Sequence, residues 1–161
     1  MAALRSILVP ADGSPPSLSA LAHAVALAEE SDARIDVVHV EVSTLLSPEN
    51  RDEDEAALDA AIEQARAELG ERVSHRTLSG DPLRTIIEVA SSGDYDLVVV
   101  GTHGRIGRLH ALLGSVAEGV VRNAPCPVLT VREPGAGYQS FAERRHGRPS
   151  LAEQQSTSPT S

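Results

Sequence analysis

Apolar residues recur along the chain in two patterns that alternate with each other. Short runs rich in Val, Ile and Leu are typical of buried strands, and they cover residues 4–10, 34–42, 95–100 and 127–132. A more polar segment with an alternating pattern predicts an edge strand over residues 73–78. Longer segments carry apolar residues at helical spacing, and they cover residues 17–31, 50–69, 82–92 and 116–122. This alternation predicts an α/β protein with a parallel sheet covered by helices on both faces.

For two of the predicted helices, the sequence also indicates which face is buried or where the helix begins and ends. The apolar stripe of the helix over residues 50–69 consists of Leu58, Ile62, Ala65 and Leu69. Its acidic residues are expected to face water. The following helix has clear end signals, because Asp81 can cap its N-terminus, Pro82 suits its first turn and Gly93 can end it.

A glycine-bearing segment joins the strand at residues 95–100 to the helix that follows it. It reads Gly101-Thr102-His103-Gly104, then nine residues, then Gly114-Ser115. Glycine lets the backbone approach an anion closely, and the free N–H groups of a helix N-terminus point toward that anion. Ligands of parallel sheets bind at the carboxyl ends of the strands. The segment therefore predicts a site for the phosphates of a nucleotide.

Charge and composition narrow the choice of function. The chain has 161 residues and a formal net charge of −9, which argues against a general affinity for nucleic acids or anionic membranes. All 14 basic residues are arginine, so a Walker-A lysine and a lysine nucleophile are excluded. The single cysteine excludes an internal disulfide. No apolar run has transmembrane length and no signal-peptide pattern is present, so we expect a cytoplasmic protein.

The alternating pattern stops after Arg132. Residues 134–161 are rich in Gly, Pro, Ser, Gln and Arg and contain few residues suited to a core. This composition is typical of disordered segments. We therefore expect a folded domain over residues 1–133 and a disordered C-terminal tail over residues 134–161.

The glycine spacing, together with the ends of the first two strands, resembles the universal stress protein family over residues 4–132. ATP-binding members of that family carry Gly, two residues, Gly, nine residues, Gly, then Ser or Thr. Here the matching residues are Gly101, Gly104, Gly114 and Ser115, with no departure in spacing. An aspartate after the first strand is matched by Asp12, and a His-Val pair at the end of the second strand is matched by His39-Val40.

The resemblance implies a three-layer, open twisted sheet of five parallel strands in the order 3-2-1-4-5, a Rossmann-like fold of the adenine nucleotide alpha hydrolase type. It implies ATP as the ligand, with Mg²⁺ held through the phosphates, and a homodimer joined through the strand at residues 128–132. The nucleotide-binding residues that it implies are Pro10, Ala11, Asp12, Val40, Gly101, Thr102, His103, Gly104, Arg105, Gly114, Ser115 and Val116.

Several of these positions also have a plainer interpretation. Asp12 could stabilise the turn Asp-Gly-Ser, His39 could be a packed core histidine, and Arg105 could be solvated. Ser115 and Glu118 have the spacing of a capping box, which would explain the serine without any ligand. A structural role and a ligand-binding role can coexist at Ser115.

Three classes of function remain open at this point. The leading interpretation is an ATP-binding stress sensor or switch. The second is a dimeric interaction scaffold with the same fold and no nucleotide. The third is a slow ATPase or phosphotransferase with Ser115 as a phosphate acceptor. No nucleophile with a paired base can be assembled from the sequence, so slow or absent turnover is expected.

Overall fold

The structure, a computed structural model, describes residues 3–42, 51–103, 113–133 and 141–142. Its strands are β1 (Ser6–Pro10), β2 (Arg34–Glu41), β3 (Val73–Ser79), β4 (Leu97–Gly101) and β5 (Val128–Val131). Its helices are α1 (Pro15–Ser31), α2 (Arg51–Leu69), the 3₁₀ turn η1 (Gly70–Arg72), α3 (Pro82–Ser92) and α4 (Ser115–Asn123). The alternation predicted from the apolar pattern is confirmed.

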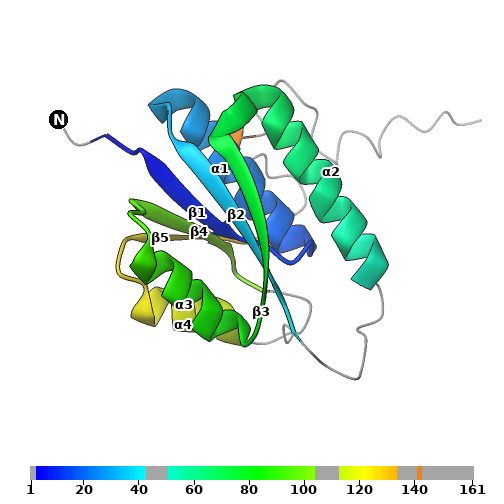
Figure 1. Cartoon of the computed structure of the whole chain (residues 1–161), viewed down its shortest axis with the longest axis vertical. Helices are drawn as coiled ribbons and strands as arrows, with labels where there is room; N and C mark the ends of the chain where they lie inside the picture. The colour runs from blue at the N-terminus through cyan, green and yellow to red at the C-terminus, as the bar shows by residue number, and fades with distance from the viewer. Residues whose placement is uncertain (1–2, 43–50, 104–112, 134–140, 143–161) are drawn as a thin grey trace, which may run out of the picture.

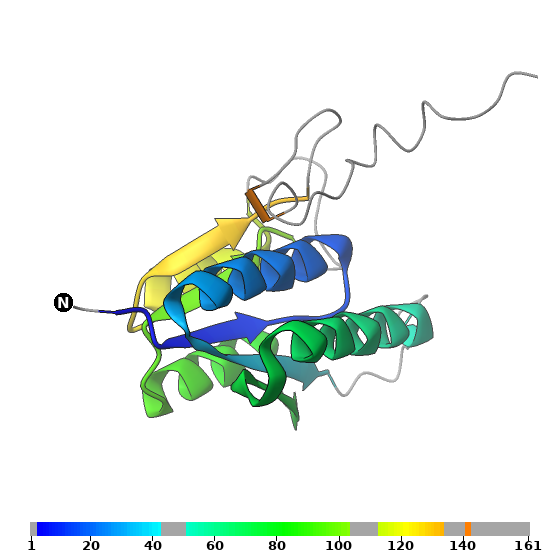
Figure 2. The ribbon, with the colours of Figure 1, turned by 90° about the horizontal axis from the view of Figure 1, so that it is seen from above.

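All the described strands form one parallel sheet in the order β3-β2-β1-β4-β5. Helices α1 and α2 pack together on one face, and α3 and α4 pack together on the other, which gives three layers (Figures 1 and 2). The N-terminal strand β1 lies at the centre of the sheet, whereas β3 and β5 are its edges. The predicted fold class and strand order are confirmed.

The two faces of the sheet bury separate cores because successive strand residues point to opposite sides. Ile7, Val37 and Val99 belong to the core under α1 and α2. Leu8 and Val98 belong to the core under α3 and α4. Every residue of β1 is buried, as expected for the central strand of a sheet covered on both faces.

The helix ends largely follow their sequence signals. The carboxylate of Asp81 accepts a hydrogen bond from the N–H of Arg84 at 2.9 Å, and Gly93 ends α3, so both predicted end signals are confirmed. Helix α1 begins at Pro15, two residues earlier than predicted, because proline suits the first helical positions. Among the described helices, none combines the length and the apolar composition that a membrane span requires.

The acidic residues of α2 do not all face water, which corrects the expectation from its pattern. Asp54 is only 8% exposed and lies on the buried side of α2 with Leu58. Its backbone packs against the turn between β1 and α1, where Gly13 has φ +82°. A Cβ atom at Gly13 would lie 2.1 Å from the carbonyl oxygen of Asp54. The first turn of α2 therefore lies directly against the turn that follows β1.

Two residues from the C-terminal segment lie within the described part of the chain. The ring of Phe141 meets the ring of His23 on α1 edge to face, with a centroid distance of 4.9 Å and an interplanar angle of 87°. Ala142 is only 5% exposed. Both residues form a short helical turn (orange in Figure 2) on the side of α1 toward β5. The rest of residues 134–161 lies outside the described ranges.

Candidate functional site

A crevice opens at the carboxyl end of the sheet because β1 and β4 stop pairing early. Their register ends at Leu8 opposite Val98, whereas β1 stays paired with β2 up to Pro10, opposite Val38. From there the chain continues from β1 to α1 on one face and from β4 to α4 on the other. Neighbouring strands that lead to opposite faces create the place where open parallel sheets bind ligands.

The turn after β1 satisfies its own backbone groups. The hydroxyl of Ser17 accepts hydrogen bonds from the N–H groups of Asp12 and Gly13 at 3.3 and 3.1 Å. The carboxylate of Asp12 accepts hydrogen bonds from the N–H and the hydroxyl of Ser14. The interpretation of Asp12 as a turn-stabilising residue is therefore confirmed. Because these three N–H groups are engaged, this turn is a poor site for an anion.

The N-terminus of α4 differs from the turn after β1 in how its backbone N–H groups are bonded. Its N-cap residue is Gly114, and no side chain among the described residues caps it. The N–H of Gly114 donates to the carbonyl of Thr102 at 2.6 Å, which places Ser115 inside the first turn of the helix. The capping box predicted for Ser115 and Glu118 is therefore wrong. First-turn N–H groups without such a cap bind a ligand or water.

Gly101, the last residue of β4, lies directly against the start of α1. A Cβ atom at Gly101 would lie 2.7 Å from the carbonyl carbon of Pro16 and 2.9 Å from the backbone nitrogen of Ser17. Glycine is therefore required here by the packing of two backbones. From the sequence, Gly101 was explained only by a close approach to phosphate, and this packing of β4 against α1 was not foreseen.

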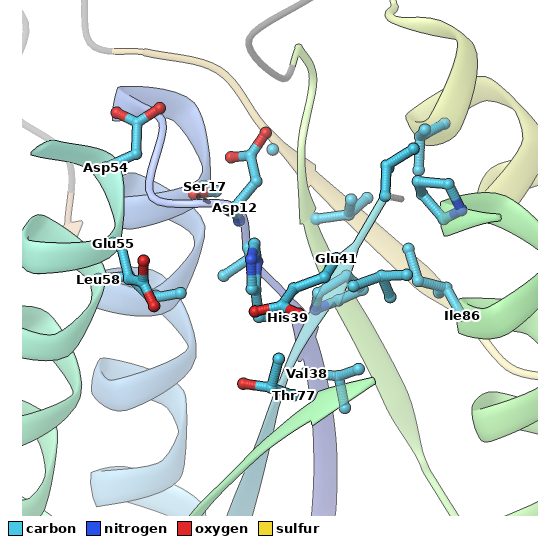
Figure 3. Close-up of a pocket in the computed structure, with 18 of the residues that line it drawn as sticks. Asp12, Ser17, Val38, His39, Glu41, Asp54, Glu55, Leu58, Thr77 and Ile86 are labelled. Carbon is cyan, nitrogen blue, oxygen red and sulfur yellow. Dashed lines mark hydrogen bonds between the residues drawn. The ribbon is translucent and has the colours of Figure 1, made fainter. Parts of the chain in front are cut away.

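A pocket of about 430 Å³ occupies the crevice (Figure 3). Most of the predicted nucleotide-binding residues line it, namely Pro10, Ala11, Asp12, Val40, Gly101, His103, Gly114, Ser115 and Val116. Thr102 does not line the pocket. It is 8% exposed, and its N–H donates to the carbonyl of Val131 at 2.8 Å, which ties the loop to β5. Gly104 and Arg105 lie outside the described residues.

The end of β2 forms one wall of the pocket, because β2 extends beyond β1. The carbonyl of Val38 accepts a hydrogen bond from the N–H of Ala11 at 3.0 Å. Strands repeat every two residues, so the backbone groups of Val40 point to the same side, past the end of β1. The carbonyl of Glu41 points to the other side, where Gly80 donates to it at 3.1 Å. Val40 thus presents a donor and an acceptor to the crevice.

Two histidines line the same wall. The Nδ1–H of His39 donates to the carbonyl of Ala11 at 3.0 Å, so the predicted hydrogen bond is confirmed, but His39 is half-buried and lines the pocket instead of lying in the core. The Nε2 atom of His75 on β3 is buried and has no hydrogen-bond partner among the described residues. Burial lowers the pKa of His75, and the nearby carboxylate of Asp59 opposes that shift. His75 is therefore neutral at neutral pH.

Sequence reasoning missed the wall that α2 contributes. The lining residues from this helix are Arg51, Asp54, Glu55, Leu58 and Asp59. Figure 3 shows Asp54 and Glu55 on one side of the pocket and Ile86 of α3 on the other. The signal was present in the sequence, because Asp54 lies four residues before Leu58 and so interrupts the apolar stripe with a carboxylate.

The charge of the described pocket lining is predominantly negative. The lining carboxylates are Asp12, Glu41, Asp54, Glu55 and Asp59, whereas Arg51 is the one arginine among the described lining residues. Among the residues that the structure describes, no group of three or more His, Cys, Asp or Glu side chains could hold a metal ion.

Comparisons with known proteins agree with this architecture. The family model described as "Universal stress protein family" matches residues 3–132. A universal stress protein of Methanocaldococcus jannaschii is 38% identical over 142 residues, which cover 81% of this chain and 83% of that protein. Universal stress protein A homolog 1 of Coxiella burnetii is 34% identical over 139 residues, which cover 79% of this chain and 95% of that protein.

Two solved structures are similar over the same part of the chain. The universal stress protein UspA from Lactobacillus plantarum has a TM-score of 0.69 and 26% identity, and covers 82% of this chain and 100% of that one. A universal stress protein in complex with cAMP has a TM-score of 0.64 and 29% identity, and covers 83% of this chain and 100% of that one. The sequence match and the shared fold agree: this chain belongs to the universal stress protein family.

Proposed function

We propose that this protein binds ATP, or a closely related adenine nucleotide, in the pocket between the ends of β1 and β4. The observation that carries the proposal is the N-terminus of α4, where the N-cap residue is Gly114 and no described residue provides a side-chain cap. Such a helix end attracts phosphate through its free N–H groups and its dipole. The engaged turn after β1 offers no equivalent site. The similar structure that holds cAMP supports an adenine nucleotide.

The ribose and the base would occupy the opposite half of the pocket. Asp12 lines the pocket between β1 and α1, and a carboxylate there suits ribose hydroxyls better than phosphates. The backbone N–H and C=O of Val40 point past the end of β1 and match the donor and acceptor on the edge of an adenine ring. The two halves together suit one nucleotide that spans the crevice.

Mg²⁺ fits this proposal as a partner of the phosphates. The described pocket lining is acidic, and the chain contains no lysine to neutralise a triphosphate. Mg²⁺ binds proteins through few carboxylates when substrate phosphates complete its coordination. Arg105 and Arg108 supply positive charge in the glycine segment of the sequence, although both lie outside the described residues.

The role that we infer is that of a cytoplasmic stress-response switch rather than of an efficient enzyme. Fast turnover needs positioned groups that transfer protons. In the described part of the pocket, His39 already donates to Ala11, and Asp12 is bonded to Ser14. Nucleotide binding that changes the shape or the partners of the domain requires no such groups.

Substitution of Gly114 tests the site without unfolding the domain. In Gly114→Asp, the new carboxylate can cap α4, so stability should stay equal or rise by a few tenths of a kcal/mol. The same carboxylate would occupy and repel the phosphate position, so affinity for Mg-ATP should fall at least about tenfold, or about 1.4 kcal/mol. Isothermal titration calorimetry with Mg-ATP measures the affinity.

The matched control is Gly114→Asn, which offers a cap of the same shape without the charge. Its affinity should lie between those of the wild type and Gly114→Asp. If wild-type protein gives no heat with millimolar Mg-ATP, the proposed ligand is wrong. If both variants bind as the wild type does, the phosphates lie elsewhere than at α4.

We also propose a two-fold homodimer joined through β5. Strand β5 is an edge of the sheet, and Val128, Leu129 and Thr130 are only partly buried. An apolar edge without charges invites pairing with another strand, and β5 itself contains no charged residue, with Arg132 and Glu133 following it directly. Two copies paired through this edge would close a symmetric dimer with no β5 edge left over.

Thr130→Pro should dissociate this dimer, because the backbone N–H of Thr130 points away from β4 toward the open edge, and proline cannot donate to a strand ladder there. Thr130→Lys should weaken it more mildly, since an edge lysine opposes pairing. Sedimentation equilibrium at tens of micromolar measures the association, and circular dichroism checks that both variants remain folded. A wild-type monomer at that concentration would refute the interface, and a dimer that neither variant affects would place it elsewhere.

A further inference from the structure

One part of the pocket lies between helix α2 and the edge strand β3. Val73 of β3 is buried in the core under α1 and α2, and residues two apart on a strand share a face of the sheet. His75 and Thr77 therefore face the same helices. Both line the pocket together with Leu58 and Asp59 of α2, and Figure 3 shows Leu58 and Thr77 on different walls. His75 thus occupies the place where α2 packs on β3.

The Nε2 atom of His75 is an exception among the buried polar atoms. In the described part of the chain it is the one buried side-chain nitrogen or oxygen without a hydrogen-bond partner, and buried polar groups are bonded in the large majority of cases. A neutral imidazole carries one N–H and one lone pair, so the neutral ring leaves only an uncharged atom unbonded. Protonation would make Nε2 a charged donor, and an unbonded charge costs far more to bury.

The charged groups around His75 do not offset this cost. Burial has the largest influence and lowers the pKa of His75, whereas Asp59 on α2 raises it and both Arg66 on α2 and His39 on β2 lower it. Asp59 is exposed, so water weakens its attraction. Arg66 is held near by its ion pair with Glu63 at 2.9 Å. Because the pKa is lower in this packed position than in water, a fall in pH through the ordinary range of histidine favours the release of His75.

We propose that His75 makes the α2 wall of the pocket proton-sensitive: α2 rests against β3 while His75 is neutral, and it moves away from β3 when His75 binds a proton. Strand β3 is an edge with one neighbour, so α2 can separate from it while the sheet stays paired. The same helix carries Asp54 and Leu58 into the pocket, so its movement changes the pocket. The consequence for a ligand, weaker binding of an adenine nucleotide at acidic pH, rests on the function proposed above.

Hydrogen–deuterium exchange of the full chain tests the movement of α2 without any ligand. At equal pH the intrinsic exchange rates over residues 51–69 are the same in each variant, so the ratio between variants reports opening. At about pH 7.5 these amides should exchange alike in the wild type and in His75→Phe. At about pH 5.5 they should exchange about three- to tenfold faster in the wild type, because a histidine of ordinary pKa is mostly protonated there. Exchange over residues 82–92 of α3 should not differ.

Two further variants keep the comparison specific. His75→Gln also lacks a nitrogen that binds a proton, but it is smaller than phenylalanine and retains a polar end. It should match His75→Phe, and it takes its place if the larger ring prevents folding. The matched control is His23→Phe on α1, because His23 is also a half-buried histidine but does not line the described pocket. This control should exchange as the wild type does at both pH values.

Isothermal titration calorimetry with Mg-ATP at the same two pH values tests the consequence for the pocket. On acidification, the affinity of the wild type should fall at least about threefold further than that of His75→Phe. Protonation of the nucleotide, of His39 and of the pocket carboxylates is common to both proteins, so it cancels in this comparison.

The outcomes separate the proton-sensitive wall from the proposed ligand. Equal exchange over residues 51–69 in the wild type and His75→Phe at about pH 5.5 would refute the proposal. Slower exchange in the wild type would refute it as well, because protonated His75 would then bind Asp59 and tighten α2. Faster exchange without the difference in affinity would refute the link to the pocket. If no variant binds Mg-ATP but α2 still opens on acidification, the ligand is wrong and the proton-sensitive wall stands.

Discussion

Replacement of Gly13 by alanine is expected to lower the free energy of unfolding by about 3 kcal/mol. Gly13 has φ +82°, and an L side chain in the left-handed region costs about 1–2 kcal/mol. The new Cβ would also lie 2.1 Å from the carbonyl oxygen and 2.6 Å from the carbonyl carbon of Asp54. Forcing packed groups apart adds about 1–3 kcal/mol. Urea unfolding followed by circular dichroism measures the loss.

The matched control is Gly70→Ala. Gly70 also has a positive φ, +63°, but apart from its chain neighbours no described residue has an atom within 4 Å of its Cβ position. This variant should lose only the conformational part, about 1 kcal/mol. Equal losses at the two glycines would mean that the contact between Gly13 and Asp54 contributes nothing. In that case α2 would be held over the end of β1 by its apolar face alone.

The second large effect is expected at Gly101. Gly101→Ala would place a Cβ atom 2.7 Å from the carbonyl carbon of Pro16, and neither backbone can yield without moving α1 or β4. Overpacking of this kind should lower the free energy of unfolding by about 2 kcal/mol. Since Gly101 and Ser17 both line the pocket, the affinity for Mg-ATP should fall as well, at least about fivefold, or about 1 kcal/mol. Urea unfolding and calorimetry measure the two effects.

Gly119→Ala controls for added volume away from the pocket. The three atoms nearest to its Cβ position all belong to the side chain of Leu83, with Cδ2 at 2.3 Å, and a half-buried leucine can change rotamer. Alanine also gains up to about 1 kcal/mol of helix propensity over glycine. Stability should therefore change little, and affinity not at all. A loss of affinity in Gly119→Ala equal to that in Gly101→Ala would contradict a local effect at the pocket.

The period of the apolar positions was sufficient to predict the layers of the fold. The runs that became β1, β2 and β4 are buried on both faces, and such strands form parallel sheets covered by helices. The order of the strands came from the resemblance to a family, since no periodicity specifies which strands are neighbours. Helix ends were predictable where one residue decides them, as at Asp81.

The rest of the site depends on contacts between segments that are distant in sequence. The capping box at Ser115 had the right spacing, but the hydrogen bond from Gly114 to Thr102 moved the start of α4. Asp54 was assigned to water because helix patterns treat every carboxylate as solvated. Its burial comes from Gly13, 41 positions earlier in the chain. Sequence rules for helices and strands describe one element at a time, whereas the walls of the pocket are made by elements in contact with each other.

The central place of β1 also dictates an order of folding during synthesis. Strand β1 is made first, but its second neighbour, β4, begins only at Leu97, and the carboxylate that binds the N–H groups of Arg5 and Ser6 belongs to Asp96. At about 5–20 residues per second, roughly 5–20 s of translation separate the two strands. Throughout that interval the apolar core strand is the open edge of a half-built sheet. The nascent chain is therefore most prone to aggregation before the ribosome reaches β4.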